Sequence, residues 1–484
     1  MKEPLLIGLD QGSSSTKGIL YDSRRQKILA ETRGKVSTRR RTKDDRHFVE
    51  HDPGDILRSV REAAEFLLKK APPGSAIRVG LACQRSSFLL MEASGKALTP
   101  VVSWQDTRGA KIAQKLKKYN ALVYQKTGLY LTPYYALTKL LWFFENNPHW
   151  KSRAKKGDIL FAPLATYLAY HLTYEKTFAV DATHAQRSLL MNIRTCQWDK
   201  GLLKLFGIPA AMLPEIKNTT ANYGTLASSP PRPLLTAMIG DQQAAAWAIF
   251  SDHERRKTAL INLGTGGFVL IPTGPRPKRV PGLLSGILSK TWRAGYLLEG
   301  TVNSVQGVLV WMKNTGILKK SDVFRMPQKN EWEKIPVVVS GFGGLAAPYW
   351  RSDLKTSIFH LARATHREDF LRGFLLGLAH LFWEILRPLK GTSFYPRELI
   401  ASGGLSNSAG LMKILSSYLE LPIRTVRYSD LTVLGAALAA RKTGKGSFIR
   451  PSRLFCPGRQ DQNKLDRHRQ KIHAAIKMLV NRIA

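Results

Sequence analysis

The chain has 484 residues, of which 44% are hydrophobic and 23% charged. This length predicts about two globular domains, and the composition excludes an intrinsically disordered chain. Lysine and arginine number 74 against 35 acidic residues, a net charge of +39. Such a charge favours anionic ligands such as nucleotides, phosphorylated products, nucleic acid or acidic lipid. The basic residues are scattered, however, and no aromatic-interleaved nucleic-acid module occurs, so we expect no nucleic-acid partner.

The cysteines and apolar runs indicate the compartment. Cys83, Cys196 and Cys456 lie far apart and form no metal-binding or disulfide pattern, which is typical of a reducing environment. The first apolar stretch, residues 5–9, is too short for a signal peptide, and no apolar run is long enough to span a membrane. We therefore expect a cytoplasmic protein without a membrane partner.

In chain order, the first half alternates short apolar strands with amphipathic helices. We expect strands over 5–10, 17–21, 28–31 and 78–82, and helices over 54–70, 108–118, 137–146 and 160–172. The first helix follows Pro53, has Asp52 in position to cap it, and ends before the Pro72-Pro73-Gly74 run.

The second half repeats this plan. We expect strands over 258–272 and 398–402, and helices over 302–314, 367–386 and 408–418. Because each half begins with a strand meander and continues with alternating helix and strand, the sequence predicts two α/β domains, residues 1–250 and 251–484, with a cleft between them. The second would end in a basic tail, since residues 441–484 contain 12 Lys and Arg against 2 Asp.

Two hairpins, residues 6–21 and 259–271, resemble each other. Each is an apolar run, a turn rich in glycine and hydroxyl residues, and a second apolar run. Such a turn points backbone N–H groups into one concavity, and hydroxyls add donors for phosphate oxygens. The pair suggests two related halves that offer turns to one polyphosphate, although two ordinary hairpins would look similar. Asp10 ends the first strand, where a carboxylate can hold Mg²⁺.

The usual nucleotide-binding loops are absent from the sequence. Neither G-x-x-x-x-G-K-[ST] nor a G-x-G-x-x-G after a strand occurs. If the protein binds a nucleotide, it must therefore do so through the paired hairpins. Gly403-Gly404, between a predicted strand and helix, is a third candidate contact, or else a simple turn.

A series of short motifs then identifies a family. In order they are Leu9-Asp-Gln-Gly12, Val49-Glu-His-Asp-Pro53, Gln84-Arg85, Trp104-Gln-Asp-x-Arg108, Thr127-Gly-Leu129, Pro133-Tyr134, Asp181-Ala-Thr183, Gly240-Asp-Gln-Gln-Ala-Ala245, Gly264-Thr-Gly266, Leu298-Glu-Gly300, Gly344-Leu-x-Ala-Pro-Tyr-Trp350, Gly403-Gly404 and Leu434-Gly-Ala-Ala437. Over nearly the whole chain this order resembles the FGGY carbohydrate kinases, and among them the glycerol kinases. The resemblance implies two actin/hexokinase-like (ribonuclease H-like) α/β domains with ATP and substrate in the cleft between them.

The resemblance also implies roles for individual residues. Asp241 matches the catalytic base, which would take the proton of the acceptor hydroxyl; without the resemblance it would be interpreted as a helix cap. Asp10 matches the carboxylate associated with Mg²⁺. The matching ATP-binding residues are Ser13, Ser14, Ser15, Lys17, Thr265, Gly266 and Gly404. Gln306, Val310 and Ser408 differ from the glycerol kinase pattern, which leaves donors other than ATP open.

The acceptor pocket matches the glycerol kinases only in part. Its matching positions are Arg85, Trp104, Tyr134, Asp241, Gln242 and Phe268, with Ser86 beside them. Ser86 stands where glycerol kinases have a glutamate that accepts hydrogen bonds from glycerol. Loss of that acceptor would weaken glycerol binding or make room for a larger ligand. Glycerol, a tetritol, a pentitol and a ketose all remain candidates.

We therefore expect an ATP-dependent kinase for a small polyol or sugar. The alternative is an inactive regulatory protein of the same fold that binds an anionic partner or nucleic acid through its basic surface. Retention of Asp10, Thr265 and Asp241 favours the kinase. Members of this family are commonly dimers or tetramers, which implies a homodimer or homotetramer.

Overall fold

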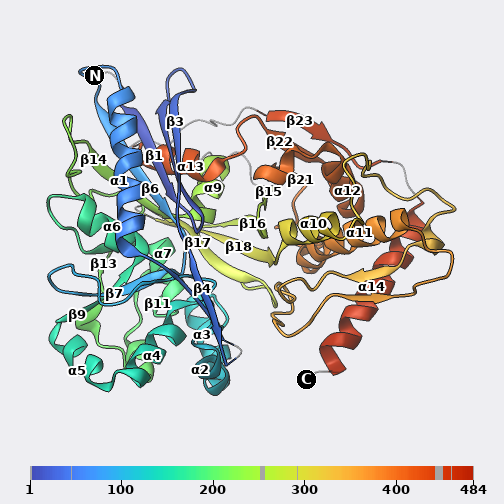
Figure 1. Ribbon diagram of the computed structural model, residues 1–484, viewed down its shortest axis with the longest axis horizontal. Helices are drawn as coiled ribbons and strands as arrows, with labels where there is room; N and C mark the ends of the chain where they lie inside the picture. Colours follow the sequence, from blue (N-terminus) through green and yellow to red (C-terminus); the bar gives the residue numbers. More distant parts are fainter. Residues whose placement is uncertain are drawn as a thin grey trace.

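The computed structural model describes residues 3–44, 46–250, 257–291, 293–441, 451–458 and 461–482. Two lobes lie side by side, each built around a β-sheet with helices against it (Figure 1). The first lobe is formed by the N-terminal half of the chain and the second mainly by the C-terminal half. The predicted domain boundary after residue 250 borders residues 251–256, which are outside the described residues.

The main sheet of the first lobe has five strands in the order β14-β6-β1-β2-β3. Their bounds are β1 (Leu5–Gln11), β2 (Ser15–Asp22), β3 (Lys27–Lys35), β6 (Ile77–Cys83) and β14 (Leu234–Gly240). The first three form an antiparallel meander, and β1, β6 and β14 run parallel. The carboxyl ends of these three parallel strands therefore meet at one edge of the sheet.

The main sheet of the second lobe repeats this topology. Its order is β17-β18-β16-β15-β21-β22-β23, with β15 (Thr258–Leu263), β16 (Gly267–Gly274), β17 (Leu284–Lys290), β18 (Ala294–Val302), β21 (Glu398–Ser402), β22 (Ile423–Val426) and β23 (Pro451–Phe455). Strands β15, β16 and β18 pair antiparallel side by side, β17 adds to the outer edge of β18, and β15, β21 and β22 run parallel. The expected pair of related α/β halves is confirmed.

The remaining strands form smaller sheets. A second five-stranded sheet of the first lobe has the order β4 (Arg39–Lys43), β5 (Arg46–His51), β8 (Val101–Val102), β7 (Phe88–Glu92) and β9 (Ile159–Pro163). Three two-stranded sheets pair β10 (Ala179–Asp181) with β13 (Glu215–Lys217), β11 (Met191–Asn192) with β12 (Gln197–Trp198), and β19 (Val337–Val339) with β20 (Ser357–Phe359).

The helices confirm most of the predicted pattern. In the first lobe they are α1 (Pro53–Lys70), α2 (Ala110–Lys115), α3 (Asn120–Thr127), α4 (Ala136–Asn146), α5 (Pro148–Lys156), α6 (Leu164–Leu172), α7 (Ala182–Ala185) and α8 (Lys200–Phe206). The later ones are α9 (Asp241–Phe250), α10 (Val305–Asn314), α11 (Arg367–Leu386), α12 (Ala409–Leu419), α13 (Leu431–Ala439) and α14 (Gln462–Arg482). Asp52 caps α1 as expected, accepting from the Gly54 N–H at 2.8 Å.

Three predicted helices were too long. Residues 159–163 form β9, because Ile159 and its neighbours pair with β7, and α6 begins only at Leu164. The helix expected over 108–118 is limited to α2 and a 3₁₀ turn over Lys117–Tyr119. The helix expected from residue 302 begins at Val305, because the strand β18 continues to Val302.

Helices α9 and α13 join the two halves. A Cβ on Gly435 of α13 would lie 1.8 Å from the Ala244 carbonyl oxygen of α9, so the two helices cross at backbone contact. Helix α13 also lies directly on the first sheet, since a Cβ on Gly80 would lie 1.9 Å from the Ala436 carbonyl oxygen. Only glycine permits such approaches. The crossing brings the N-terminus of each helix close to the cleft edge of the sheets.

Other predictions concern the cysteines and the tail. Cys83, Cys196 and Cys456 are all free thiols. Among the described residues, none of the helices combines the length and hydropathy needed to cross a membrane. The described part of the basic tail is folded: β23 pairs with β22, and Leu465 and Ile472 of α14 are buried in the core of the second lobe. Residues 442–450, 459–460 and 483–484 lie outside the described part.

Helix α14 carries a buried histidine with a consequence for stability. His468 is 4% exposed, and its ring lies 5.5 Å from that of Trp332. Burial, with smaller contributions from His380 and Lys471, lowers the pKa of His468 from 6.5 to about 3. The His468 ring therefore binds a proton more tightly in the unfolded chain than in the folded protein. Stability is lost as the pH falls below the pKa that this histidine has in the unfolded chain.

We expect His468 alone to cost about 2 kcal/mol of unfolding free energy when the pH falls from about 7 to about 5. His468→Gln removes the titrating ring, so its stability should decline less over the same interval. Urea unfolding of both proteins at the two pH values measures the difference. An equal decline in both proteins would show that His468 does not contribute.

Candidate active site

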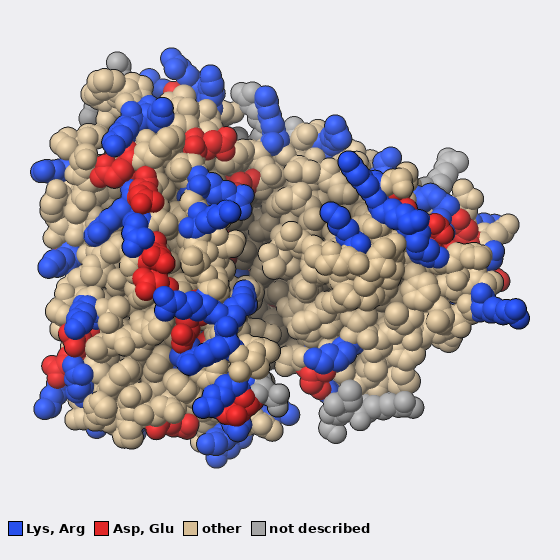
Figure 2. Space-filling view, viewed as in Figure 1, with Lys and Arg blue, Asp and Glu red and all other residues tan. Residues whose placement is uncertain are grey.

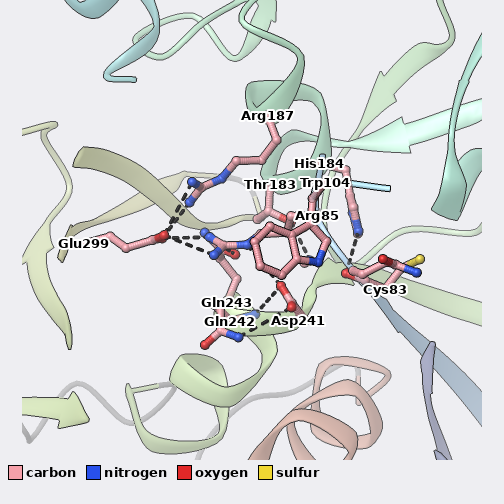
Figure 3. A network of polar contacts seen from close by, with 12 residues as sticks. Cys83, Arg85, Trp104, Thr183, His184, Arg187, Asp241, Gln242, Gln243 and Glu299 are labelled. Carbon is pink, nitrogen blue, oxygen red and sulfur yellow. Dashed lines mark hydrogen bonds and ion pairs between the residues drawn. The ribbon is translucent and has the colours of Figure 1, made fainter. Parts of the chain in front are cut away.

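The parallel strands of the first sheet place polar residues together at their carboxyl ends. Asp10 lies near the end of β1, Arg85 follows β6, and Asp241 follows β14. Arg85 Nε lies 3.0 Å from Asp241 Oδ1. Figure 3 shows the contacts that extend from this pair into both lobes.

Asp241 begins helix α9 and remains partly open to solvent. Its side chain is 28% exposed, and its Oδ1 accepts from the Gln242 N–H at 2.8 Å and forms an ion pair with Arg85. Among the described residues, its Oδ2 has a single long contact, 3.4 Å from Gln242 Nε2. An accessible carboxylate with one weakly engaged oxygen can accept a proton from a hydroxyl placed beside it.

A buried network fixes the backbone just before Asp241. The Gly240 N–H donates to Thr183 Oγ1 at 2.7 Å, and that hydroxyl donates to Asp181. Asp181 also contacts His184 Nδ1 at 2.7 Å. A Cβ on Gly240 would lie 2.9 Å from the Arg85 side chain, so glycine is required for the close approach. The Asp181-Ala-Thr183 motif thus supports the β14–α9 junction.

Arg85 is held on its other side by the second lobe. Its Nη1 and Nη2 donate to Glu299 of β18 at 2.7 and 3.0 Å, and Arg187 Nη2 donates to the same carboxylate at 2.6 Å. Burial alone would raise the pKa of Glu299, but Arg187 and Arg85 outweigh it and hold the pKa at about 2. Glu299 is therefore an ionised, buried acceptor.

The carboxylate of Asp10 is buried. Its residue is 6% exposed, and among the described residues its Oδ1 has no hydrogen-bond partner. Burial, then the nearby Asp430, raises its pKa to about 8; Asp241 adds to this rise and Lys17 opposes it. Lys17 Nζ instead pairs with Asp430 at 2.6 Å. An orphaned carboxylate oxygen near two other carboxylates fits a bound cation such as Mg²⁺, which would stabilise the ionised form.

The first predicted phosphate turn contacts the predicted acceptor pocket. The Gly12 N–H donates to the Ser15 carbonyl oxygen at 3.0 Å and closes the turn. Ser13 Oγ accepts from the indole Trp104 Nε1 at 3.0 Å and lies 3.1 Å from Gln84 Oε1. Ser14 is exposed on the turn, whereas Ser15 is buried in β2.

The second predicted phosphate turn lies in the hairpin between β15 and β16. Its Gly264 N–H donates to the Gly266 carbonyl oxygen at 3.0 Å, and Thr265 is exposed. Gly403 has a positive φ, and a Cβ there would lie 2.3 Å from the Leu263 carbonyl oxygen, so the Gly403-Gly404 turn lies against this hairpin. Gly404 itself has open space beside it.

Two of the predicted acceptor residues, Asp241 and Phe268, contact Arg85 directly. Trp104 and Tyr134 lie with ring centroids 6.5 Å apart, and the Arg85 guanidinium lies 5.9 Å from the Phe268 ring of the second lobe. Gln242 Oε1 accepts from Asn262 Nδ2 at 3.0 Å. Ser86 is partly exposed in a left-handed backbone conformation, φ 65°. Figure 2 shows a hollow between the two lobes.

Sequence reasoning missed several members of this site. Glu299 and Gln243 were part of recognised motifs but had no assigned role, and Arg187 and Asp430 were not singled out. Nothing local in the sequence marks them, because their partners are distant: Arg85 and Glu299 are separated by 214 residues along the chain.

A second group of potential metal ligands lies in the second lobe. His380 and Glu384 of α11 face His473 of α14. Glu384 Oε1 lies 2.6 Å from His473 Nδ1 and 3.1 Å from His380 Nε2. Arg387 also contacts Glu384, at 3.3 Å. His473 Nδ1 and Arg387 Nη2 are hydrogen-bonded to Glu384, so these residues form a polar network that joins α11 to α14.

Comparison with known proteins identifies the class of this site. Sequence profiles described as "FGGY family of carbohydrate kinases", N-terminal and C-terminal domains, match residues 5–244 and 259–443. The chain belongs to the FGGY family of carbohydrate kinases. It is accordingly a phosphotransferase with an alcohol group as acceptor, and ATP use follows from membership of this kinase family. The interpretation as a kinase therefore holds over that of an inactive regulatory protein.

Particular relatives are similar over almost their whole length. A glycerol kinase of Thermus brockianus is 33% identical over 457 residues, covering 91% of this chain and 90% of the relative. A crystal structure of Plasmodium falciparum glycerol kinase with ADP superposes with a TM-score of 0.85 at 27% identity, covering 99% and 98% of the two chains. A xylulose kinase of Lactobacillus acidophilus has the same fold, with a TM-score of 0.85 at 22% identity and coverage of 99% and 100%.

Proposed function

We propose that the protein transfers the γ-phosphoryl group of ATP to a hydroxyl of a small polyol, with Asp241 as the general base. The observation that supports this most is the placement of Asp241. It is a partly exposed carboxylate at the shared edge of β1, β6 and β14, beside Arg85 and near Asp10. The glycerol kinase relatives support a polyol as the acceptor class.

In this proposal each part of the site has a defined task. The acceptor hydroxyl lies beside Asp241 Oδ2, which takes its proton as the oxygen attacks the γ-phosphorus. The new O–P bond forms while the bond from the γ-phosphorus to the β–γ bridging oxygen breaks, and ADP leaves. The turns around Ser14 and Thr265 offer backbone N–H groups and hydroxyls to the phosphates from opposite lobes. Gly404 leaves space for the nucleotide.

Asp10 is the residue that would hold Mg²⁺ beside this centre. The ion would neutralise charge on the phosphoryl group. The unpartnered Oδ1 of Asp10 and the nearby Asp430 supply the negative charge that the cation requires. Lys17, which pairs with Asp430, can reach an anionic phosphate with the same ammonium group.

The identity of the acceptor depends on Ser86. A serine presents a short, neutral hydroxyl where the glycerol kinase pattern has a carboxylate acceptor. We infer that the pocket takes a polyol or sugar larger than glycerol, whose own hydroxyls fill the space and contact Ser86. Trp104 and Phe268 would supply apolar walls for its carbon atoms, and Gln242 a polar contact.

The Ser86→Glu variant tests this inference. We expect it to raise kcat/KM for glycerol by about ten- to hundredfold, because a charge-assisted hydrogen bond contributes about 1.5–3 kcal/mol. The same change should lower kcat/KM for the best wild-type acceptor. A coupled ADP-release screen over glycerol, tetritols, pentitols and ketoses, run on both proteins, measures the two effects. A fall in glycerol turnover would show instead that this pocket is already suited to glycerol.

Three further features stay predictions. We propose that the domain boundary lies near residue 250, between the matched ranges 5–244 and 259–443. A homodimer or homotetramer and a cytoplasmic location are expected from the family and from the separated cysteines. Size-exclusion chromatography with light scattering would determine the oligomeric state.

A further inference from the structure

A buried ion-pair network joins the candidate base to the second lobe. Glu299 lies on β18, whereas Arg85 and Arg187 come from the first lobe. All three side chains are at least nine-tenths buried, with side-chain exposures of 2%, 9% and 3%. Figure 3 shows both guanidinium groups converging on the Glu299 carboxylate, with Asp241 on the far side of Arg85.

Arg85 has little capacity left for a substrate. A guanidinium has about five N–H donors. Nε engages Asp241 at 3.0 Å, Nη1 engages Glu299 and Gln243 at 2.7 and 3.2 Å, and Nη2 engages Glu299 at 3.0 Å. Arg85 therefore acts chiefly as a rigid link between two carboxylates, one in each lobe.

The charges of this network balance. Two guanidinium groups, Arg85 and Arg187, face two carboxylates, Glu299 and Asp241. If Glu299 lost its charge, Arg85 would keep Asp241 as its carboxylate partner in this network, whereas the buried Arg187 would keep none. Arg85 would then be free to shift, and Asp241 Oδ1 would lose the fixed position of its ion-pair partner.

We propose that Glu299 and Arg187 are positioning residues for phosphoryl transfer. Through Arg85 they set the orientation of the Asp241 carboxylate, so the second lobe fixes the base that the first lobe carries. The proposal rests on the proposed role of Asp241 as the base. Misplacement of a reacting group by about 1 Å can cost about a hundredfold in rate, so a fixed orientation matters.

A merely structural network would behave differently from a positioning one. Loss of a structural ion pair would lower the melting temperature and the amount of folded enzyme, with kcat per folded molecule unchanged. Loss of a positioning contact lowers kcat with little change in the KM for ATP, because the nucleotide contacts lie elsewhere. The two roles are therefore separated by kcat measured per correctly folded site.

The principal test uses Glu299→Gln, which keeps the shape of the side chain and removes its charge. We expect kcat to fall by about 10- to 100-fold, with the KM for ATP within about twofold of wild type. Glu50→Gln is the matched control, because Glu50 pairs with the buried Arg108 at 2.5 Å on the first lobe, outside the network. The control should keep wild-type kcat.

Arg187→Gln and Arg187→Lys decide the question if Glu299→Gln does not fold. Because Arg187 acts through Glu299, Arg187→Gln should lower kcat, and Arg187→Lys should restore part of it by returning the charge. If both single variants fold, the double variant Arg187→Gln/Glu299→Gln should be no slower than Glu299→Gln alone. Titration with a fluorescent ATP analogue gives the concentration of folded sites, and kcat is the maximal rate divided by that concentration.

Two results would overturn the proposal. One is wild-type kcat per folded site in Glu299→Gln or, where that variant does not fold, in Arg187→Gln. The other is a kcat loss in Glu50→Gln as large as that in Glu299→Gln. Asp241→Asn separates this proposal from the proposed function. If Asp241→Asn keeps wild-type turnover, the base assignment itself is wrong; if it is inactive while Glu299→Gln is normal, only the positioning role fails.

Discussion

Asp241→Asn is expected to lower kcat by about 10²- to 10⁴-fold, the usual contribution of a general base. Asparagine has nearly the same shape and can still accept from the Gln242 N–H, which contacts Asp241 Oδ1 at 2.8 Å, although it loses the ion pair with Arg85 Nε at 3.0 Å. It cannot take up the proton of an attacking hydroxyl at neutral pH. The loss should therefore appear in kcat, while ATP binding stays close to that of wild type.

The measurement combines coupled ADP release at saturating acceptor with ATP binding by calorimetry. Asp353→Asn is a suitable control, since Asp353 forms an exposed ion pair with Arg351 and should have wild-type kcat when it is replaced. Undiminished turnover in Asp241→Asn would remove the carboxylate from the mechanism. Loss of ATP binding together with turnover would point to a structural role at the start of α9.

Asp10→Asn is expected to reduce turnover and to stabilise the protein free of metal and nucleotide. We expect kcat to fall by about 10²- to 10³-fold, the scale of a lost electrostatic contact to the reacting phosphoryl group. The same carboxylate is costly in the unliganded protein, because burial and Asp430 raise its pKa from 3.8 to about 8. Asparagine has no charge to bury, so activity and stability should change in opposite directions.

The sign of this stability effect follows from proton binding. The folded state holds the Asp10 proton more tightly than the unfolded chain, so the favourable contribution of wild-type Asp10 is lost as the pH rises from about 4 towards about 8. The advantage of Asp10→Asn should therefore grow by about 1 kcal/mol per pH unit between about pH 5 and pH 7.5. Urea unfolding with EDTA present measures it. A variant less stable than wild type at neutral pH would contradict this account.

Much of the fold could be predicted from local sequence patterns. The helix over residues 53–70 was predictable because its cap, its first-turn proline and its stop signal lie within its own segment. The hairpins at 6–21 and 259–271 predicted the two related sheets, since a hairpin needs only its two strands and its turn. The helix expected over 160–172 was wrong at its start, because residues 160–163 pair with β7, a strand distant in the sequence.

The site could be predicted less completely than the fold. Asp10 and Asp241 could be identified because each follows a strand within a recognised motif, and the structure brings them to one edge of one sheet. The substrate contact expected of Arg85 stays a prediction, and the Glu299 carboxylate, which accepts from two of its nitrogens, could not be foreseen. Such long-range pairs depend on the closing of two lobes, which no local pattern encodes.

The large positive charge has no single location. Figure 2 shows Lys and Arg over both lobes on the face in view, with acidic side chains among them on both. This distribution agrees with scattered basic residues in the sequence and does not outline one binding surface. The charge would still raise the local concentration of ATP around the protein.

A crystal structure with a non-hydrolysable ATP analogue, Mg²⁺ and an acceptor polyol tests the central claim most directly. The account predicts the triphosphate between the turns that contain Ser14 and Thr265, the metal ion near Asp10, and an acceptor hydroxyl within hydrogen-bond distance of Asp241. A nucleotide bound away from both turns, or an acceptor out of reach of Asp241, would contradict it.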